Sequence, residues 1–157
     1  MIDRQARDRF ALLLRRLASG RIHTDDFFNE VPDRSEDPAI QPLFNEMWGA
    51  FYTDYGPDRF VGRKSLPPKT RRQVAQVILF LHSDIEYTWP PTPEPHPLRA
   101  LGNAFTFGLL GLGIDEALKT WQAQGDFDAY PFRRRTELAH VSRSPRFLSS
   151  ADYRRQN

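Results

Sequence analysis

Apolar residues recur through most of this chain at the spacing of an amphipathic α-helix. In the N-terminal segment they form one stripe with intervals of three and four residues. This stripe consists of Phe10, Leu13, Leu14 and Leu17. Arg15 and Arg16 lie off the stripe, and Gly20 is the residue type that commonly follows a helix end. The pattern predicts a helix from about Asp3 to Ser19.

The next segment, RIHTDDFFNE (residues 21–30), predicts a short helix and also offers candidate metal ligands. Thr24 can serve as the N-cap, and Asp25 and Asp26 then lie at the positive end of the helix dipole. The candidate ligands are His23, Asp25, Asp26 and Glu30. Their spacing matches neither the HExxH zinc motif nor an EF-hand loop, so helix capping is the preferred interpretation. No metal site is predicted.

A third helix is predicted to begin at Asp37-Pro38, with Asp37 as the N-cap and Pro38 in the first turn. Pro42 has no backbone N–H to donate, so it is expected to delay the regular helix. A strong apolar stripe follows at helical spacing, formed by Ile40, Leu43, Phe44, Met47, Trp48 and Phe51.

A fourth helix is predicted over roughly Lys69 to Ser83, directly after Pro67-Pro68. Its main stripe consists of Val74, Val77, Ile78 and Leu81. Leu79 and Phe80 add apolar surface on other sides, which is typical of a helix in the middle of a structure. The β-branched content leaves a buried strand over residues 76–81 as an alternative, but the proline start and the length favour a helix.

The second half of the chain is less regular. The segment PPTPEPHP (residues 90–97) has five prolines and should form a stiff, extended connector. A helix over residues 98–110 is weakened by Gly102 and Gly108, and a clearer one is predicted over residues 114–121.

A short helix at about Arg133–Ser142 and a final turn from Ser149 complete the predicted elements. No alternating strand pattern and no internal repeat is visible. The sequence therefore predicts a mainly α fold, a single domain over residues 1–157. We expect an irregular bundle of about five to six helices, crossed by the extended proline-rich segment.

Composition narrows the class of protein. The chain has 157 residues, enough for one domain with a core, and it has no cysteine, which excludes disulfides, a thiolate nucleophile and cysteine-based zinc sites. No signal peptide is visible, and the longest apolar run, residues 104–114, is too short to cross a bilayer. GLLGLG (residues 108–113) matches no phosphate-binding fingerprint, so no cofactor is predicted. We expect a cytoplasmic protein without a membrane partner.

The segment HSDIEYTWP (residues 82–90) follows the fourth helix and permits two interpretations. In one, Asp84 and Glu86 are paired carboxylates and His82 is a general base, as in a hydrolase or a metal-dependent enzyme. In the other, which we prefer, the segment is a structural corner whose Tyr87 and Trp89 pack back on the core. A carboxylate near the negative end of a helix then needs a partner, and an arginine is expected.

Positive charge is concentrated at the C-terminus. Residues 131–157 contain seven arginines against Glu137 and Asp152, a net charge of +5, while the whole chain has +2. Arginine interleaved with aromatic residues can track a phosphate backbone, and it can equally contact an acidic protein. Asp126 and Asp128 precede this region and are expected to pair with its arginines.

Two segments of the chain, ILFLHSDIEYTWP (residues 78–90) and GDFDAYPFRRRTEL (residues 125–138), carry a resemblance. In them the chain resembles a group of small uncharacterised bacterial proteins that share an ILFLxSDxEYxWP-like segment. In size and composition such proteins are similar to immunity proteins of toxin systems, a similarity at the level of class only. The resemblance implies no catalytic residues.

The sequence favours binding over catalysis, because no nucleophile signature is present. The leading hypothesis is a protein-interaction module, of the immunity type, that binds and occludes a partner protein such as a toxin. Its candidate contact residues are exposed aromatic and charged side chains: Asp84, Glu86, Tyr87, Trp89, Tyr130, Arg133, Arg134 and Arg135. The alternatives are nucleic-acid binding through the C-terminal arginines, and an enzyme that uses Asp84, Glu86 and His82.

Overall fold

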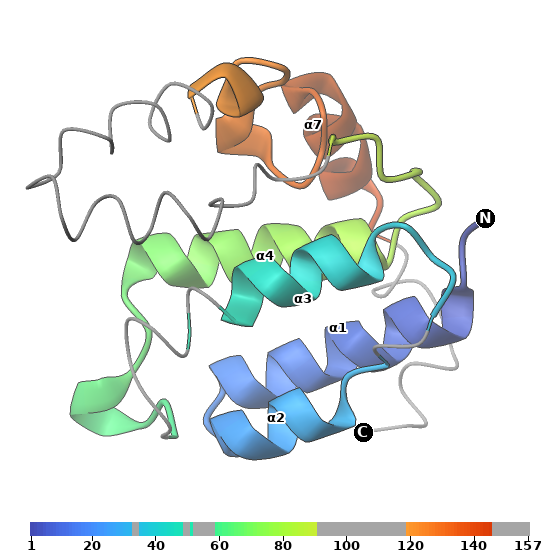
Figure 1. Ribbon diagram of the computed structural model, residues 1–157. Coiled ribbons are helices and arrows are strands. Elements are labelled where there is room, and N and C mark those ends of the chain that lie inside the picture. The colour runs from blue at the N-terminus through green and yellow to red at the C-terminus, as the bar shows by residue number, and fades with distance from the viewer. Residues whose placement is uncertain (33–34, 49–50, 52–58, 91–118, 146–157) are drawn as a thin grey trace, which may run out of the picture.

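The computed structural model describes residues 1–32, 35–48, 51, 59–90 and 119–145. In these ranges the chain is mainly α-helical and contains no strand (Figure 1), as the hydrophobic pattern predicts. The elements in chain order are α1 (Arg4–Ala18), α2 (Thr24–Glu30), α3 (Ile40–Trp48), the 3-10 helix η2 (Gly62–Lys64), α4 (Pro68–Leu81), the 3-10 helix η3 (Phe127–Ala129) and α7 (Arg135–Arg143).

Some predicted features lie outside the described residues. These are most of the proline-rich connector, the helix expected over 98–110, the GLLGLG segment and the turn from Ser149. Of the helix predicted over 114–121, residues 119–121 are described, and they are helical. None of the described helices combines the length and the apolar character that a bilayer crossing requires.

Helix α1 follows its predicted course. Asp3 caps it, with its side chain accepting a hydrogen bond from the Ala6 backbone N–H at 3.0 Å. The predicted apolar stripe is fully buried. Gly20 follows the helix with φ of +69°, and a Cβ atom there would collide with the Val61 side chain. Glycine is therefore required at this position for both conformation and space.

Helix α2 begins as predicted, but its cap is one residue earlier. The N-cap is His23, whose Nδ1 accepts from the Asp25 backbone N–H at 3.4 Å, and Asp26 bonds back to the His23 N–H at 3.1 Å. The prediction of Thr24 as the cap is wrong, because Thr24 is fully buried within the first helical turn. The preceding residue is therefore left to cap the helix.

Asp37 caps a leading turn rather than the regular helix α3. Its side chain accepts from the Ala39 N–H at 2.9 Å, and its carbonyl oxygen accepts from the Ile40 N–H at 3.1 Å. Regular helix begins only at Ile40. This delay agrees with the prediction from Pro42, which cannot donate a backbone hydrogen bond in the first turn.

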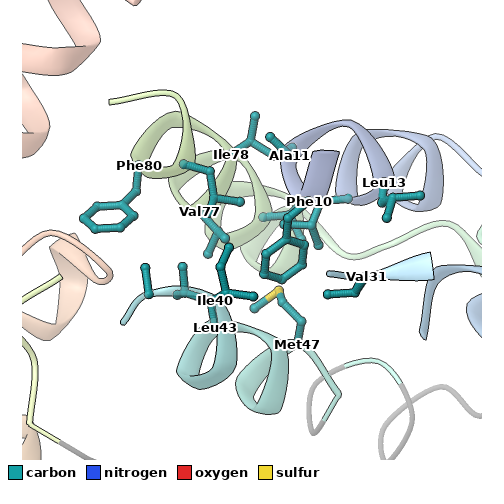
Figure 2. Packing of buried hydrophobic residues seen from close by; sticks show 14 of the residues in the cluster. Phe10, Ala11, Leu13, Val31, Ile40, Leu43, Met47, Val77, Ile78 and Phe80 are labelled. Atoms are coloured by element: carbon teal, nitrogen blue, oxygen red, sulfur yellow. The ribbon is translucent and has the colours of Figure 1, made fainter. Parts of the chain in front are cut away.

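Helix α4 is the central element of the described chain, and the alternative of a strand is wrong. Pro68 occupies its first position, and the helix contacts α1 on one side and α7 on another (Figure 1). Figure 2 shows Val77 of α4, Phe10 of α1 and Ile40 and Met47 of α3 converging on one core. A helix in this position must be apolar on several sides, which explains the burial of both Ile78 and Phe80.

The described residues after the connector pack on the same core. Phe132 contacts Phe80 of α4, with ring centroids 5.3 Å apart. Trp89 lies between Trp121 and Tyr130, at centroid distances of 5.1 and 5.3 Å. This aromatic cluster fixes residues 119–132 against the corner that follows α4.

Candidate functional site

The corner after α4 is held by two arginines of α1. Arg4 donates to the carbonyl oxygens of Leu81 and Ser83, both at 2.7 Å, and to Asp84 Oδ1 at 2.6 Å. The last carbonyl groups of a helix have no partner within the helix, so these bonds cap α4 from another element. The expected arginine partner of this carboxylate is therefore Arg4.

Arg7 of α1 is buried completely and ties three parts of the chain together. Its guanidinium donates to both carboxylate oxygens of Asp37, at 2.6 and 3.1 Å, and to the carbonyl oxygens of Ser83 and Ile85. It also lies 5.1 Å from the centre of the Phe80 ring. This pair thus joins α1, the start of α3 and the corner after α4, and its bonds satisfy the groups that it buries.

Two of the three residues of the enzymatic alternative, His82 and Asp84, line a cavity at this corner. His82 is buried, with Nδ1 3.3 Å from Asp8 Oδ1, and burial lowers its pKa although Asp8 opposes the shift. His82 and Asp84 line a cavity of about 330 Å³ together with His140, whereas Glu86 is not among its lining residues. Among the described residues, no group of three histidines or carboxylates could hold a metal ion.

The prediction that Trp89 and Tyr130 are exposed contact residues is wrong. They are 5% and 7% exposed, since they pack against each other and against Trp121 in the aromatic cluster. Tyr87 is half-buried, and its hydroxyl lies 3.0 Å from the Tyr130 hydroxyl. The interpretation of this segment as a structural corner, with the aromatic side chains packed on the core, therefore holds for these residues.

The arginines of the candidate site are largely engaged within the chain. Arg133 donates to the carbonyl oxygens of Gln124 (2.8 Å) and Thr88 (2.5 Å) and lies over the Trp89 ring. Arg134 is exposed, at the start of α7.

Arg135 forms ion pairs with Asp126 at 2.5 Å and Asp128 at 2.7 Å. The prediction that these two aspartates neutralise part of the C-terminal charge is confirmed for Arg135. The exposed positive charge of this region is correspondingly smaller than the sequence suggests.

A larger hollow lies elsewhere and was not identified from the sequence. It has a volume of about 640 Å³, and its lining residues come from α3, α4, η3 and α7 and include Tyr130, which follows η3. We call it the groove, and its lining residues are Glu46, Lys69, Arg72, Gln73, Gln76, Val77, Phe127, Asp128, Tyr130, Arg135, Leu138 and Ser142. Its volume is in the range of sites that bind small ligands or protruding side chains.

Glu46 contributes a buried carboxyl group to the groove. Its Oε2 atom is shielded from solvent, and no described residue donates a hydrogen bond to it. Burial raises the pKa of Glu46 to about 7, and the nearby Tyr130 hydroxyl partly opposes this rise. Burial likewise raises the pKa of Tyr87 to about 12 and that of Tyr130 further. Both phenols therefore remain protonated donors at neutral pH.

The N-terminal half of α4 carries a set of exposed cations, which we call the α4 basic segment: Lys69, Arg71 and Arg72. None of the three forms an ion pair with a described residue, and two of them line the groove. A signal for this segment was present in the sequence, because residues 59–83 contain six lysines and arginines and no aspartate or glutamate. The C-terminal region contains more arginines, so total charge alone favours that region over α4.

Comparisons with known proteins do not assign the chain to a family. No family model matches it, and neither the curated proteins nor the solved structures give a significant match. The resemblance stated from the two sequence segments therefore stays a prediction. Any function must be argued from the groove and the charges around it.

Proposed function

We propose that this chain is a protein-interaction module that binds an acidic segment of a partner protein in the groove and along the α4 basic segment. The observation that carries this proposal is a set of exposed cations, Lys69, Arg71 and Arg72, that form no ion pair with a described residue and lie beside a hollow of about 640 Å³. The proposed contact region is therefore this surface and not the corner that follows α4.

The position of these cations is unfavourable for the isolated helix. The N-terminus of a helix carries a partial positive charge, and basic side chains there raise the free energy of the folded chain. The first turn of α4 contains no acidic residue that could compensate. Carboxylates of a bound partner would relieve this repulsion and form charge-assisted hydrogen bonds, so the segment favours an acidic partner.

A protein fits the groove better than a nucleic acid does. The groove contains the carboxyl groups of Glu46 and Asp128 beside the cations Lys69 and Arg72. A phosphate backbone carries a negative charge at every nucleotide and would meet these carboxyl groups, whereas a protein segment can place its carboxylates at the cations alone. Base stacking requires exposed aromatic rings, and in the groove Phe127 is exposed whereas Tyr130 is buried, as is Trp89 of the corner. In the described part of the C-terminal region, Arg133 and Arg135 are already bound to the chain itself.

The immunity-type role is the specific form of this proposal. An immunity protein needs no reaction chemistry, because it acts by covering a surface of its toxin. Rigid, pre-formed surfaces bind with a smaller entropic cost, and the Arg7–Asp37 pair joins α1, the start of α3 and the corner after α4. Support for a toxin as the partner comes from the similarity in size and composition alone.

Affinity capture from the native host at moderate salt, with nuclease treatment, tests the proposal. The wild type is compared with Lys69→Glu/Arg72→Glu and with a matched control, Arg16→Glu/Arg21→Glu, which makes the same charge change at residues that do not line the groove. We expect one stoichiometric protein partner that survives nuclease and is retained by the control. Because two attractive contacts become repulsive, its affinity for the first variant should fall by about tenfold or more.

Two results would contradict the proposal. One is capture of nucleic acid alone, lost on nuclease treatment. The other is a partner protein that binds the Lys69→Glu/Arg72→Glu variant as tightly as the wild type, since binding would then use another surface.

A further inference from the structure

The Glu46 carboxyl group lines the groove and is incompletely bonded among the described residues. Its Oε2 atom is buried, and no described residue donates to it. Buried polar atoms in native proteins nearly always have a partner, so an exception calls for an explanation. A ligand group that enters the groove is one explanation, because it would supply the missing donor.

The surrounding side chains do not complete Glu46. The Gln76 amide donates to the Asp128 carbonyl oxygen at 2.9 Å, and it does not donate to Oε2 of Glu46. The charged and titratable groups that line the groove with Glu46, or adjoin it through Tyr130, are Lys69 and Arg72 of α4, Asp128 of η3, Arg135 of α7, Tyr130 and Tyr87. Burial and Tyr130 account for the shifted pKa of Glu46, with no contribution from a basic side chain. The nearby cations thus leave this carboxyl group uncompensated.

We propose that Glu46 is the specific acceptor of the groove and binds an alkylammonium or guanidinium group, which in a complex is a lysine or arginine side chain of the partner. A site for a small cation is inferred from the geometry of the groove. That a side chain of a partner protein fills this site rests on the proposed function. Such a partner would carry one central cation flanked by carboxylates. The carboxylates would face Lys69 and Arg72, and the cation would face Glu46.

The charge of Glu46 distinguishes a cationic ligand from a neutral donor. With a pKa of about 7, the group is roughly half ionised at neutral pH. A cation binds the ionised form, so its affinity should rise with pH through this range. Between about pH 6 and about pH 8 the ionised fraction increases about tenfold, and the affinity should increase by the same factor. A neutral donor would show a weaker dependence on pH.

The test uses butylguanidinium as the probe and butylurea as its neutral isostere. Chain labelled with ¹³C in glutamate is titrated with each probe at about pH 6 and about pH 8, and the Glu46 side-chain carboxyl resonance is followed. We expect butylguanidinium to shift this resonance, to bind about tenfold more tightly at the higher pH and to lower the pKa of Glu46. Butylurea should bind weakly or not at all.

Two variants accompany the wild type. Glu46→Gln keeps an acceptor oxygen but removes the charge, so it should lose both the affinity and its pH dependence. Glu86→Gln changes an exposed carboxylate outside the groove and should bind as the wild type does. The wild-type titration is decisive even where the first variant folds poorly.

Equal binding of both probes, tighter binding at low pH, or a Glu46 resonance that butylguanidinium leaves unchanged would overturn the inference. These results are independent of the partner. If the small cation binds at Glu46 while no partner protein is captured, the site stands and the proposed function falls. If a partner binds through Lys69 and Arg72 while butylguanidinium leaves the Glu46 resonance unchanged, the proposed function stands and this inference fails.

Discussion

Asp37 and Glu46 lie at opposite ends of the α3 region, and both are carboxyl groups largely removed from water. Each oxygen of Asp37 accepts two hydrogen bonds, from the Arg7 guanidinium and from the backbone N–H groups of Asp3 and Ala39. By contrast, Oε2 of Glu46 accepts none from a described residue. Within the described part of the chain, the hydrogen bonds of Asp37 are complete and those of Glu46 are not.

The pKa values of the two groups show what this difference means. Burial alone would raise the pKa of both carboxyl groups. For Asp37 the Arg7 guanidinium and the backbone donors outweigh burial, and its pKa is lowered. For Glu46 burial prevails, and its pKa rises to about 7. Partners rather than burial therefore decide the charge state, which identifies Asp37 as part of the scaffold and Glu46 as a position open to a ligand.

The largest predicted effect is on the completed pair. Arg7→Met keeps much of the side-chain volume but leaves Asp37 buried without its cation, so we expect a loss of about 3–5 kcal/mol in the free energy of unfolding at neutral pH. Urea denaturation measures this loss. The lowered pKa of Asp37 means that the pair stabilises the fold above the ordinary carboxyl range, and this contribution disappears as pH falls through the folded-state value. The difference in the free energy of unfolding between the wild type and Arg7→Met should therefore become smaller in acid.

Arg9→Met is the matched control for this measurement. Arg9 forms an exposed ion pair with Glu30 at 3.4 Å, and such a pair contributes at most about 1 kcal/mol. A loss in Arg7→Met no larger than in this control would show that the buried pair is not what holds α1 to α3.

Glu46→Gln is expected to raise the free energy of unfolding, by less than Arg7→Met lowers it. Because its folded-state pKa is raised from 4.5 to about 7, the favourable contribution is complete below pH 4.5 and is lost as pH rises to about 7. Glu46→Gln removes this loss, so the variant should be more stable than wild type by up to about 3 kcal/mol above pH 7, and much less so in acid. Urea denaturation across this pH range measures the difference.

For this comparison Glu86→Gln is the control, since it makes the same substitution at an exposed carboxylate outside the groove. If the stability gained by Glu46→Gln did not grow as pH rises, the Glu46 carboxyl group would be well hydrated or already paired. Asp37 and Glu46 would then not differ as a partnered and an unpartnered carboxyl group.

Much of the scaffold follows from the sequence, because helical periodicity is a local property. The stripes of α1, α3 and α4 are buried as predicted wherever their side chains are described, apart from the half-buried Phe44. Arg7 was missed, although a signal existed. It precedes Phe10, Ala11 and Leu14 by three, four and seven residues and thus lies in register with buried positions. A cation in such a register predicts a buried partner, but the identity of Asp37, distant in sequence, requires the fold.

The candidate site was harder to predict because it depends on tertiary contacts. Whether Trp89 and Tyr130 face solvent or the core is decided by residues 119–132, which fold back onto the corner after α4. The groove needs four elements to come together, and Glu46 becomes unusual only inside it. The α4 basic segment could have been predicted from composition, since charge imbalance within a helix is a local feature.

The smallest predicted effect extends the comparison from the interior to the surface. Lys69 occupies the first turn of α4, where a negative charge is preferred, so Lys69→Glu should increase the free energy of unfolding by about 0.3–1 kcal/mol. Urea denaturation at low salt measures this gain, and Lys69→Gln should give about half of it because it removes the cation without adding an anion. A variant that is more stable but binds the partner less well would show that Lys69 is retained for recognition at a cost in stability. If Lys69→Glu instead destabilised the chain, Lys69 would belong to the scaffold, as Arg7 does, and the α4 basic segment would not be a surface left open for a partner.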